Sequence, residues 1–153
     1  VLKVINSFVN TRGGDLIIGV EDENNKIIGL EQELKHFYSK KHKTLTKQKD
    51  EFDREFALTL RTFFEINFIG KDKNISSEFV EMEDGALVYH VSCSPSIKPC
   101  VINKVEKGIG KKINEELKGK EYFIRKKSES LPLDGAEKGD YIFERASLAS
   151  GEE

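Results

Sequence analysis

The spacing of apolar residues over the first 30 positions predicts a helix followed by two short strands. Five apolar residues recur at helical intervals, namely Val1, Val4, Ile5, Phe8 and Val9. Residues 1–9 are therefore expected to form a helix with one apolar face. Residues 16–20 are short, apolar and rich in β-branched side chains, which favours a buried strand. The turn signal Asn24-Asn25 separates them from residues 26–30, so a hairpin is predicted here.

The middle of the chain shows first a helical and then a strand pattern. A helix is predicted over about residues 48–67, because five apolar residues fall on one side: Phe52, Phe56, Leu60, Phe63 and Phe64. These side chains are interpreted as core and not as a base-stacking surface. Residues 75–83 and 86–93 have strand patterns and are joined at Asp84-Gly85, which is a strong hairpin signal.

The last third of the chain predicts further strands and one helix. The predicted elements are a strand at 100–102, a strand at 121–125, a loop at 126–135 and a short helix at 141–148. Residues 104–118, rich in Lys, Glu and Gly, are expected to be an exposed insertion, and residues 149–153 a frayed tail. The order of elements predicts an α+β domain, in which a mixed β-sheet with hairpins is packed by two or three helices.

Composition narrows the class of protein. At 153 residues the chain is expected to form one domain, 1–153, with a real core, although the helix pattern at Val1 suggests that N-terminal residues are missing. The net charge of −2 gives no global reason to expect a nucleic-acid partner, but a local basic face is compatible with it. We see no signal peptide and no apolar run near the roughly 20 residues of a membrane span, so a cytoplasmic protein without a membrane partner is expected. Cys93 and Cys100 are expected to be free thiols rather than a disulfide.

Three motifs give the chain a resemblance to a known family. The first is Asn10-Thr11-x-Gly13-Gly14-x-Leu16-x-Ile18-Gly19-Val20-x-Asp22, followed by Ile28-Gly29-Leu30. The others are Lys98-Pro99-Cys100-Val101 and Tyr122-Phe123-Ile124-Arg125-Lys126-Lys127-Ser128-x-Ser130. Together they resemble the Schlafen family, and more narrowly its Alba-like domain, over about residues 2–130. Lys127 stands where the family commonly has Gly, so a different conformation of this loop is expected.

The resemblance implies a domain that binds nucleic acid, either DNA or RNA, mainly through the backbone. It also implies an alternative, in which the parent protein is a nuclease that depends on Mg²⁺ or Mn²⁺. In Schlafen nucleases two glutamates precede the first helix. They are not in this chain, and Asp22 falls at the remaining acidic position. By their chemistry alone, Glu21, Asp22 and Glu23 fit either a divalent-cation site or an exposed acidic turn.

Basic residues supply the candidate contacts to nucleic acid. Residues 35–49 contain six Lys, two His and no acid. Lysine gives affinity for phosphates that is independent of base sequence and sensitive to salt. The candidate contacts are Lys40, Lys41, Lys43, Lys47, Lys49, Arg125 and Lys126. The alternatives are a solvated loop for the lysines and an ion pair with an acid for Arg125.

The glycine motif is expected to form a structural turn made by Asn10, Thr11, Gly13 and Gly14. Its glycines can take positive φ or allow another chain to approach closely. The alternative is that its backbone donates to a phosphate. Because Schlafen-like units are often paired, the resemblance also implies a third possible function, a dimerisation or regulatory module with a homodimer interface at this turn.

Overall fold

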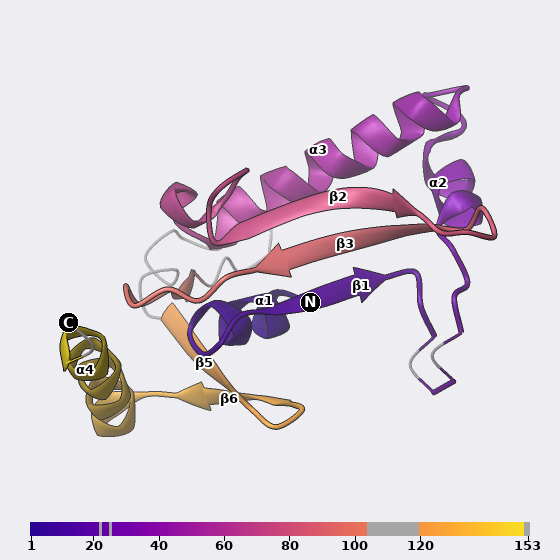
Figure 1. Cartoon of the computed structure of the whole chain (residues 1–153). Helices are drawn as coiled ribbons and strands as arrows, with labels where there is room; N and C mark the ends of the chain where they lie inside the picture. The colour runs from indigo at the N-terminus through magenta and orange to yellow at the C-terminus, as the bar shows by residue number, and fades with distance from the viewer. Residues whose placement is uncertain (22, 25, 104–119, 152–153) are drawn as a thin grey trace.

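The computed structural model describes residues 1–21, 23–24, 26–103 and 120–151, and these residues form two three-stranded sheets and four α-helices. The elements are α1 (Leu2–Val9), β1 (Gly14–Ile18), α2 (Glu31–Tyr38), α3 (Leu45–Phe63), a 3₁₀ turn (Ile66–Phe68), β2 (Ile75–Glu81), β3 (Leu87–Cys93), β4 (Ile102–Asn103), β5 (Lys120–Lys126), β6 (Glu129–Leu133) and α4 (Gly135–Gly151). The strand orders are β1-β3-β2 and β4-β5-β6. In Figure 1, α1 lies between the two sheets, α2 and α3 lie at the top, and α4 lies at the lower left.

The first sheet is built on the β2–β3 hairpin. The two strands pair antiparallel over their whole length, and β1 pairs antiparallel with the other side of β3. Gly85 has a φ of +87°, which suits the tight turn between β2 and β3. The hairpin predicted at Asp84-Gly85 is therefore confirmed.

An aromatic cluster holds α3 against one face of this sheet. Tyr89 of β3 is fully buried, and the rings of Phe52, Phe56 and Phe79 have their centroids 4.9, 5.1 and 4.8 Å from its own. Their planes are steeply inclined to the Tyr89 ring, which is a favourable arrangement of aromatic quadrupoles. The prediction that the phenylalanines of this helix form core is confirmed.

Two asparagines join α1 to the second sheet. Asn6 and Asn10 are one turn apart, both fully buried, and both face the backbone of Cys100 and Phe123. The Asn10 amide donates to the Cys100 carbonyl (2.7 Å) and accepts from the Cys100 N–H (3.0 Å). Asn6 donates to the same carbonyl (2.8 Å) and accepts from the Phe123 N–H (2.8 Å). These side chains satisfy main-chain groups that would otherwise be buried without partners.

The α+β class is confirmed, but the arrangement of strands differs from the single mixed sheet expected. The named strand pairs of the described residues are all antiparallel and divide into two sheets. The β2–β3 and β5–β6 connections are tight turns, and a tight turn can only join antiparallel neighbours. One isolated parallel bridge, between Ile69 and Ile75, lies outside the named strands.

The hairpin predicted over residues 16–30 forms only close to its turn, where the Glu21 N–H donates to the Lys26 carbonyl (2.8 Å) and the Ile28 N–H to the Gly19 carbonyl (2.9 Å). Residues 26–30 form no strand, and a single bridge joins Val20 to Ile27. Gly19 and Gly29 have φ values of +109° and +84°, which interrupt an extended backbone on both sides of the turn. β1 instead pairs with β3, although the two strands are far apart in the sequence.

From the sequence, one interpretation of the basic stretch 35–49 is a solvated loop. The stretch is not a loop throughout, because helix α2 occupies its first part. Within α2 only Leu34 is buried, so the segment has no apolar repeat by which to recognise it. The following helix, α3, begins at Leu45, earlier than predicted, and ends at Phe63. Its N-cap is Thr44, whose hydroxyl accepts from the Lys47 N–H at 3.3 Å.

The C-terminal elements are longer than predicted. The loop expected at 126–135 contains β6, which carries Pro132; β6 is an edge strand, where proline is tolerated. α4 begins at Gly135 and continues to Gly151, through the first part of the stretch expected to be frayed. The predicted insertion at 104–118 lies outside the described residues.

Candidate nucleic-acid interface

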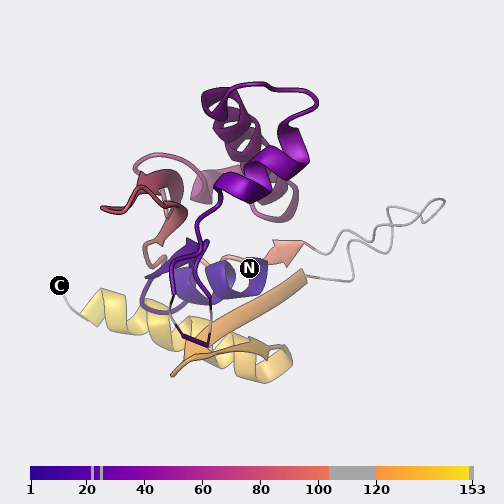
Figure 2. The same ribbon diagram turned by 90° about the vertical axis from the view of Figure 1, so that its right-hand side faces the viewer.

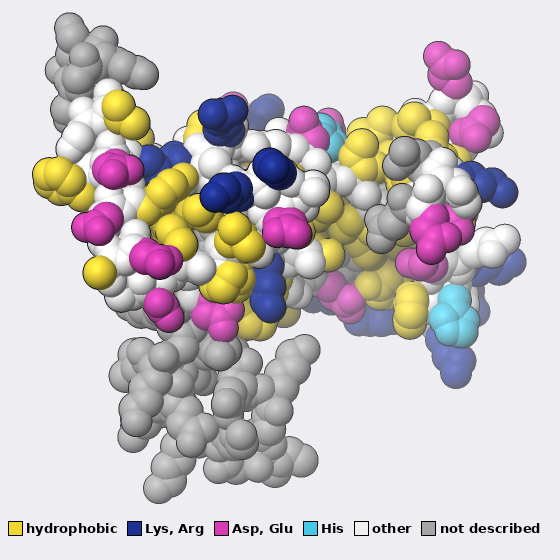
Figure 3. All heavy atoms as spheres, turned by 90° about the horizontal axis from the view of Figure 1, so that it is seen from below, with side chains coloured by type: hydrophobic (Ala, Val, Ile, Leu, Met, Phe, Trp, Pro, Cys, Tyr) yellow, Lys and Arg dark blue, Asp and Glu magenta, His cyan; other side chains and the backbone are white. Residues whose placement is uncertain are grey.

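A basic groove of about 760 Å³ lies between the turn that follows α1, the β5–β6 hairpin and the start of α4. Its charged lining residues are Arg12, Arg125, Lys126 and Lys127, and its lining contains no acid. Seen from below, Lys and Arg side chains gather over the β5–β6 hairpin, beside α4 (Figure 3). The groove therefore combines cations from the two ends of the domain sequence.

The glycine turn forms one wall of this groove. Gly13 has a φ of +76°, and a Cβ there would lie 2.5 Å from the Cys93 carbonyl oxygen, so the backbone accepts only glycine without moving. Its N–H donates to the Phe8 carbonyl at 2.7 Å. The Thr11 hydroxyl accepts from the Arg125 N–H at 2.8 Å, which ties the turn to β5. The structure thus places the predicted turn residues beside the predicted contact Arg125.

Arg125 is held by neutral partners. Its guanidinium lies 5.2 Å from the centroid of the Phe8 ring, and Nη1 donates to the Ser130 hydroxyl at 2.9 Å. The Ser130 hydroxyl is in turn 2.9 Å from that of Ser7 in α1. Among the described residues, no carboxylate lies within ion-pair distance of this guanidinium. The positive charge of Arg125 is therefore oriented but not neutralised. Of its two predicted roles, a phosphate contact and an ion pair with an acid, the described residues do not form the ion pair.

Lys127 occupies the turn of the β5–β6 hairpin with a φ of +57°. This is the left-handed region, in which a glycine is favoured and a lysine is strained. The departure from the family pattern is therefore accommodated in a conformation that Gly would also adopt. Its consequence is an additional cation at the rim of the groove.

Helix α4 supports the glycine turn from the other side. The Tyr141 hydroxyl donates to the Asn10 carbonyl at 3.1 Å. The Arg145 guanidinium donates to the same carbonyl, to the Thr11 carbonyl (2.6 Å) and to the Ser96 carbonyl (2.8 Å). All of these acceptors are neutral, so Arg145 adds positive potential behind the turn. Figure 2 shows α4 running beneath the α1 region.

The five predicted lysine contacts between residues 40 and 49 lie on the opposite side of the molecule. Figure 1 shows α2 and the start of α3 at the top and the β5–β6 hairpin at the bottom. Lys41 lies 3.4 Å from a Glu51 carboxylate oxygen, and Lys49 lies over the Phe79 ring at 5.4 Å. Lys40, Lys43 and Lys47 are exposed. The two sets of candidate contacts therefore do not form one surface.

Glu51 is the centre of charge compensation on this lysine surface, which we define as the exposed side of residues 35–49. It is buried to 8 % exposure and lies 2.5 Å from Arg54, 3.4 Å from Lys41 and 3.4 Å from Nε2 of His42. The hydrogen bond from Arg54 is the main cause that holds the pKa of Glu51 below its ordinary value. Part of the positive charge counted in the sequence is thus already neutralised.

The acidic motif is described only in part. Asp22 lies outside the described residues. Glu21 is partly buried, and its N–H donates to the Lys26 carbonyl at 2.8 Å. Within the described ranges, no group of three or more His, Cys, Asp or Glu side chains could hold a metal ion. The described residues alone therefore do not supply a ligand set for Mg²⁺ or Mn²⁺, and Figure 1 shows this loop apart from the β5–β6 hairpin.

The two cysteines are free and buried, as predicted for thiols outside a disulfide. Burial raises the pKa of Cys93 to about 12, and burial likewise raises that of Cys100 to about 12. Both are therefore protonated at neutral pH. No helix in the described part of the chain combines the length and apolarity needed to cross a bilayer.

The fold and the groove define an α+β domain with a cationic cleft between the glycine turn that follows α1 and the β5–β6 hairpin. A family model described as Schlafen, AlbA_2 matches residues 1–134, and the chain belongs to this family. The resemblance inferred from the sequence motifs is confirmed. Searches of curated proteins and of solved structures found no match. Helix α4 follows the matched range, although its Tyr141 lines the groove.

Sequence reasoning missed three groove residues. Arg12 is the unspecified position x of the Asn-Thr-x-Gly-Gly motif. A cation next to a glycine turn is a signal of anion binding by which Arg12 could have been found. Lys127 was noted only as a departure from the family pattern. Tyr141 had no local signal, because its position depends on how α4 packs against α1.

Proposed function

We propose that the basic groove binds the sugar–phosphate backbone of nucleic acid, with little readout of base sequence. One observation carries the proposal: every charged residue that lines the groove is a cation. Such a groove attracts a polyanion and releases its condensed counterions, which gives affinity without sequence information. The net charge of the whole chain, −2, does not oppose this, because the local arrangement of charge decides the approach of a ligand.

Arg125 is the residue best prepared to hold a phosphate. The Phe8 ring and the Ser130 hydroxyl fix the plane of its guanidinium before a ligand arrives. A fixed guanidinium loses little conformational entropy when it forms two parallel hydrogen bonds to phosphate oxygens. Lys126 and Lys127, both exposed, then act as mobile point charges around it.

The lysine surface has a lesser part in the proposal. Lys40, Lys43 and Lys47 are exposed and add to the attraction of nucleic acid at low salt. Lys41 and Lys49 already have partners, Glu51 and the Phe79 ring, and contribute less. We assign the groove as the binding site and the lysine surface as an additional source of electrostatic attraction.

The test compares two triple variants of the whole chain. End-labelled tRNA and duplex DNA are titrated with wild type, with Arg12→Glu/Lys126→Glu/Lys127→Glu and with Lys40→Glu/Lys43→Glu/Lys47→Glu at several salt concentrations. The groove variant should bind about 100-fold more weakly and lose about 2 to 3 from the slope of log K against log salt. The lysine variant changes the net charge equally but should lose less than about tenfold. Equal losses in both variants, or no binding by wild type, would refute the assignment.

The same titration tests the two alternatives. Each nucleic acid is incubated with Mn²⁺ or with EDTA and resolved on native and denaturing gels. Fragments that require Mn²⁺ would favour the nuclease, and Asp22→Asn in the complete protein would then be the next variant. If no nucleic acid binds and the chain sediments as a dimer, the dimerisation or regulatory module is favoured instead.

A further inference from the structure

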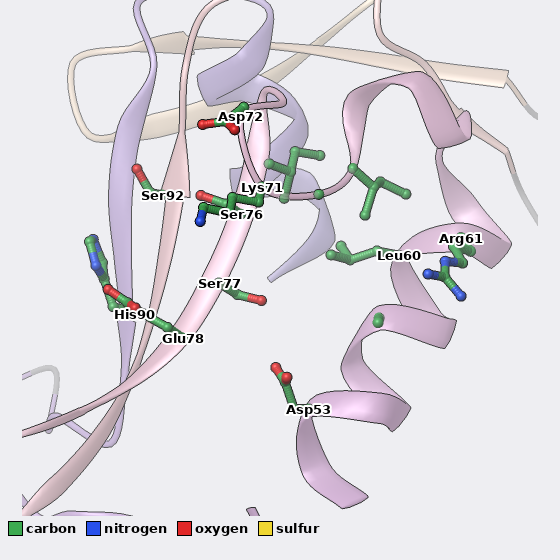
Figure 4. A pocket seen from close by; sticks show the side chains of 14 residues that line it. Asp53, Leu60, Arg61, Lys71, Asp72, Ser76, Ser77, Glu78, His90 and Ser92 are labelled. Atoms are coloured by element: carbon green, nitrogen blue, oxygen red, sulfur yellow. The ribbon is translucent and has the colours of Figure 1, made fainter. Parts of the chain in front are cut away.

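A polar cavity of about 700 Å³ lies along the open edge of the first sheet. β2 is an edge strand, because the order of the sheet is β1-β3-β2. Figure 4 shows Ser77 of β2 and Asp53 of α3 pointing into the space between the strand and the helix. The cavity also reaches Ser76 and Glu78, whose side chains lie on the other face of the strand. It therefore follows the edge of β2 and is not confined to one face.

The hydrogen-bond pattern shows which main-chain groups of β2 point outward at its open edge, of which those of Ile75 and Ser77 lie at the cavity. The Gly70 N–H donates to the Ile75 carbonyl at 2.9 Å, so the main-chain groups of Ile75 point away from β3. Orientation alternates along a strand, so the N–H and C=O groups of Ser77, Phe79 and Glu81 point the same way. The Met82 N–H donates to Ala86 at 2.8 Å, which fits the opposite orientation for even-numbered residues. In the described part of the chain, no main-chain partner reaches the three outward residues.

This edge is only partly protected: it carries Glu78 and Glu81, and the preceding loop pairs with its Ile75 end, but the outward groups from Ser77 to Glu81 are not covered by these devices. β6 is an edge strand that carries Pro132, and β4 is only two residues long. β2 is seven residues long and contains no Pro, Gly or Lys. An edge of this length with free donors and acceptors is a template for another strand.

A hydroxyl–carboxylate network joins β2 to α3 beside the cavity. The Ser77 hydroxyl is 2.7 Å from that of Tyr89, and the Tyr89 hydroxyl donates to the Asp53 carboxylate. Below it, the Tyr89 ring is packed in the aromatic cluster and is fully buried. The floor is therefore rigid and polar, and it offers hydrogen bonds to the side chains of an added strand.

Charge varies along the cavity and selects a direction. Arg61 and Lys71, with Asp72, lie near the Ile75 end, whereas Asp53 and Glu78 lie toward the other end (Figure 4). A strand that runs antiparallel to β2 would begin at the acidic end and finish at the basic end. Its N-terminal side would therefore be favoured with a cation and its C-terminal side with a carboxylate.

We propose that the open edge of β2 binds an extended peptide segment of another protein, which adds to the sheet as an antiparallel strand. The segment carries a basic residue on its N-terminal side and an acidic residue or a terminal carboxylate on its C-terminal side. Main-chain hydrogen bonds to Ser77, Phe79 and Glu81 supply the binding, and the charged ends of the cavity supply the direction. The site is independent of the nucleic-acid groove.

The probe is a capped heptapeptide, Lys-Thr-Val-Thr-Val-Thr-Glu, titrated into the isotope-labelled whole chain and followed by amide NMR. The amides of Ser77, Phe79 and Glu81 should shift, with saturation below about 1 mM peptide. A matched peptide with N-methyl groups on alternate residues cannot donate to the edge and should cause no such shifts. Absence of shifts at 1 mM, or equal binding of the methylated peptide, would overturn the proposal.

A matched pair of variants tests the edge itself. Ser77→Pro removes an N–H that faces the cavity and leaves the ladder with β3 intact, which edge strands tolerate. Ser77→Ala loses the same hydroxyl but keeps the N–H. Ser77→Pro should weaken peptide binding by at least about tenfold relative to Ser77→Ala. If Ser77→Pro does not fold, as judged by circular dichroism, Glu81→Pro and Glu81→Ala replace the pair.

Two results would contradict the proposal at this stage. The first is equal peptide binding by the proline and alanine variants. The second is self-association of the wild-type chain in sedimentation, abolished by Ser77→Pro, which would make a second copy of this chain the occupant.

Discussion

The groove and the lysine surface both gather cations, but the surroundings of these cations differ. In the groove, Arg125 is held by a phenyl ring and a hydroxyl, and no acid lines the cavity. On the lysine surface, Glu51 lies within 3.4 Å of both Lys41 and His42 and is hydrogen-bonded to Arg54. The first arrangement orients positive charge and leaves it available, whereas the second neutralises part of it.

Under our proposal that the groove is the binding site, the density of lysine in a sequence does not by itself locate such a site. The basic run at 35–49 is the most conspicuous charge pattern of the chain, yet Glu51 neutralises part of it, and Lys35, Lys40 and Lys43 share their hollow of about 560 Å³ with the acid Glu31. The groove draws Arg12 from one end of the domain and Arg125 from the other, so no window of sequence contains it. Four predictions test how far this contrast extends.

The largest expected effect is on the free energy of unfolding, through the buried hydrogen bonds that support each surface. Asn10→Ala should lower the free energy of unfolding by about 3 kcal/mol, because it leaves the buried Cys100 N–H and the Phe123 carbonyl without their partner. Gln48→Ala, which removes one bond to the His42 carbonyl on the lysine surface, should cost about 1 kcal/mol. Urea denaturation of both variants measures the difference. Equal costs would mean that the groove is not more firmly built than the lysine surface.

The next effect concerns the orientation of charge in the groove. Arg125→Lys keeps the charge but loses the planar contact with Phe8 and the bond to Ser130, so affinity for tRNA or duplex DNA should fall about fivefold to tenfold. Lys40→Arg on the lysine surface should change affinity by less than about twofold. Both are measured by titration at one salt concentration. If Arg125→Lys binds as wild type does, orientation by Phe8 has no part in binding.

The sequence predicted secondary structure well where the signal lay in neighbouring residues. The Asp84-Gly85 turn and the alternation in 86–93 needed only neighbouring residues, and both strands form. Helix α2 could not be predicted from its apolar residues, because it buries only Leu34 and one buried residue gives no helical periodicity. The loop predicted at 126–135 missed β6, and only the order β4-β5-β6 shows that this strand is an edge, where Pro132 is tolerated.

The candidate site was predictable only in its parts. The Asn-Thr-x-Gly-Gly motif and Arg125 were each recognised, but nothing local states that Thr11 accepts a hydrogen bond from Arg125. The turn also depends on Arg145, which lies at a long distance in sequence and outside the family match. Long-range contacts of this kind are decided by packing, which the motifs do not encode.

A smaller effect distinguishes the lysine surface by pH. The pKa of Glu51 is lowered in the folded state, chiefly by the bond from Arg54, so its carboxylate stabilises the fold at pH above its ordinary value of 4.5. That contribution is lost as pH falls through the lowered pKa. The stability of wild type should therefore decline more steeply between neutral pH and acid than that of Glu51→Gln, as measured by urea midpoints. Parallel curves would show that Glu51 does not organise this surface.

The smallest effect separates two adjacent lysines of the groove. Lys127 has a φ of +57°, so Lys127→Gly should relieve strain and raise the free energy of unfolding by up to about 1 kcal/mol. Lys126 ends strand β5, where glycine is unfavourable, so Lys126→Gly should lower it by about 0.5–1 kcal/mol. Both variants remove one cation and should reduce the salt slope of nucleic-acid binding by about 1. Opposite changes in stability with the same change in slope would show that the turn retains a strained lysine for its charge. If Lys127→Gly leaves the slope unchanged, Lys127 does not contact nucleic acid.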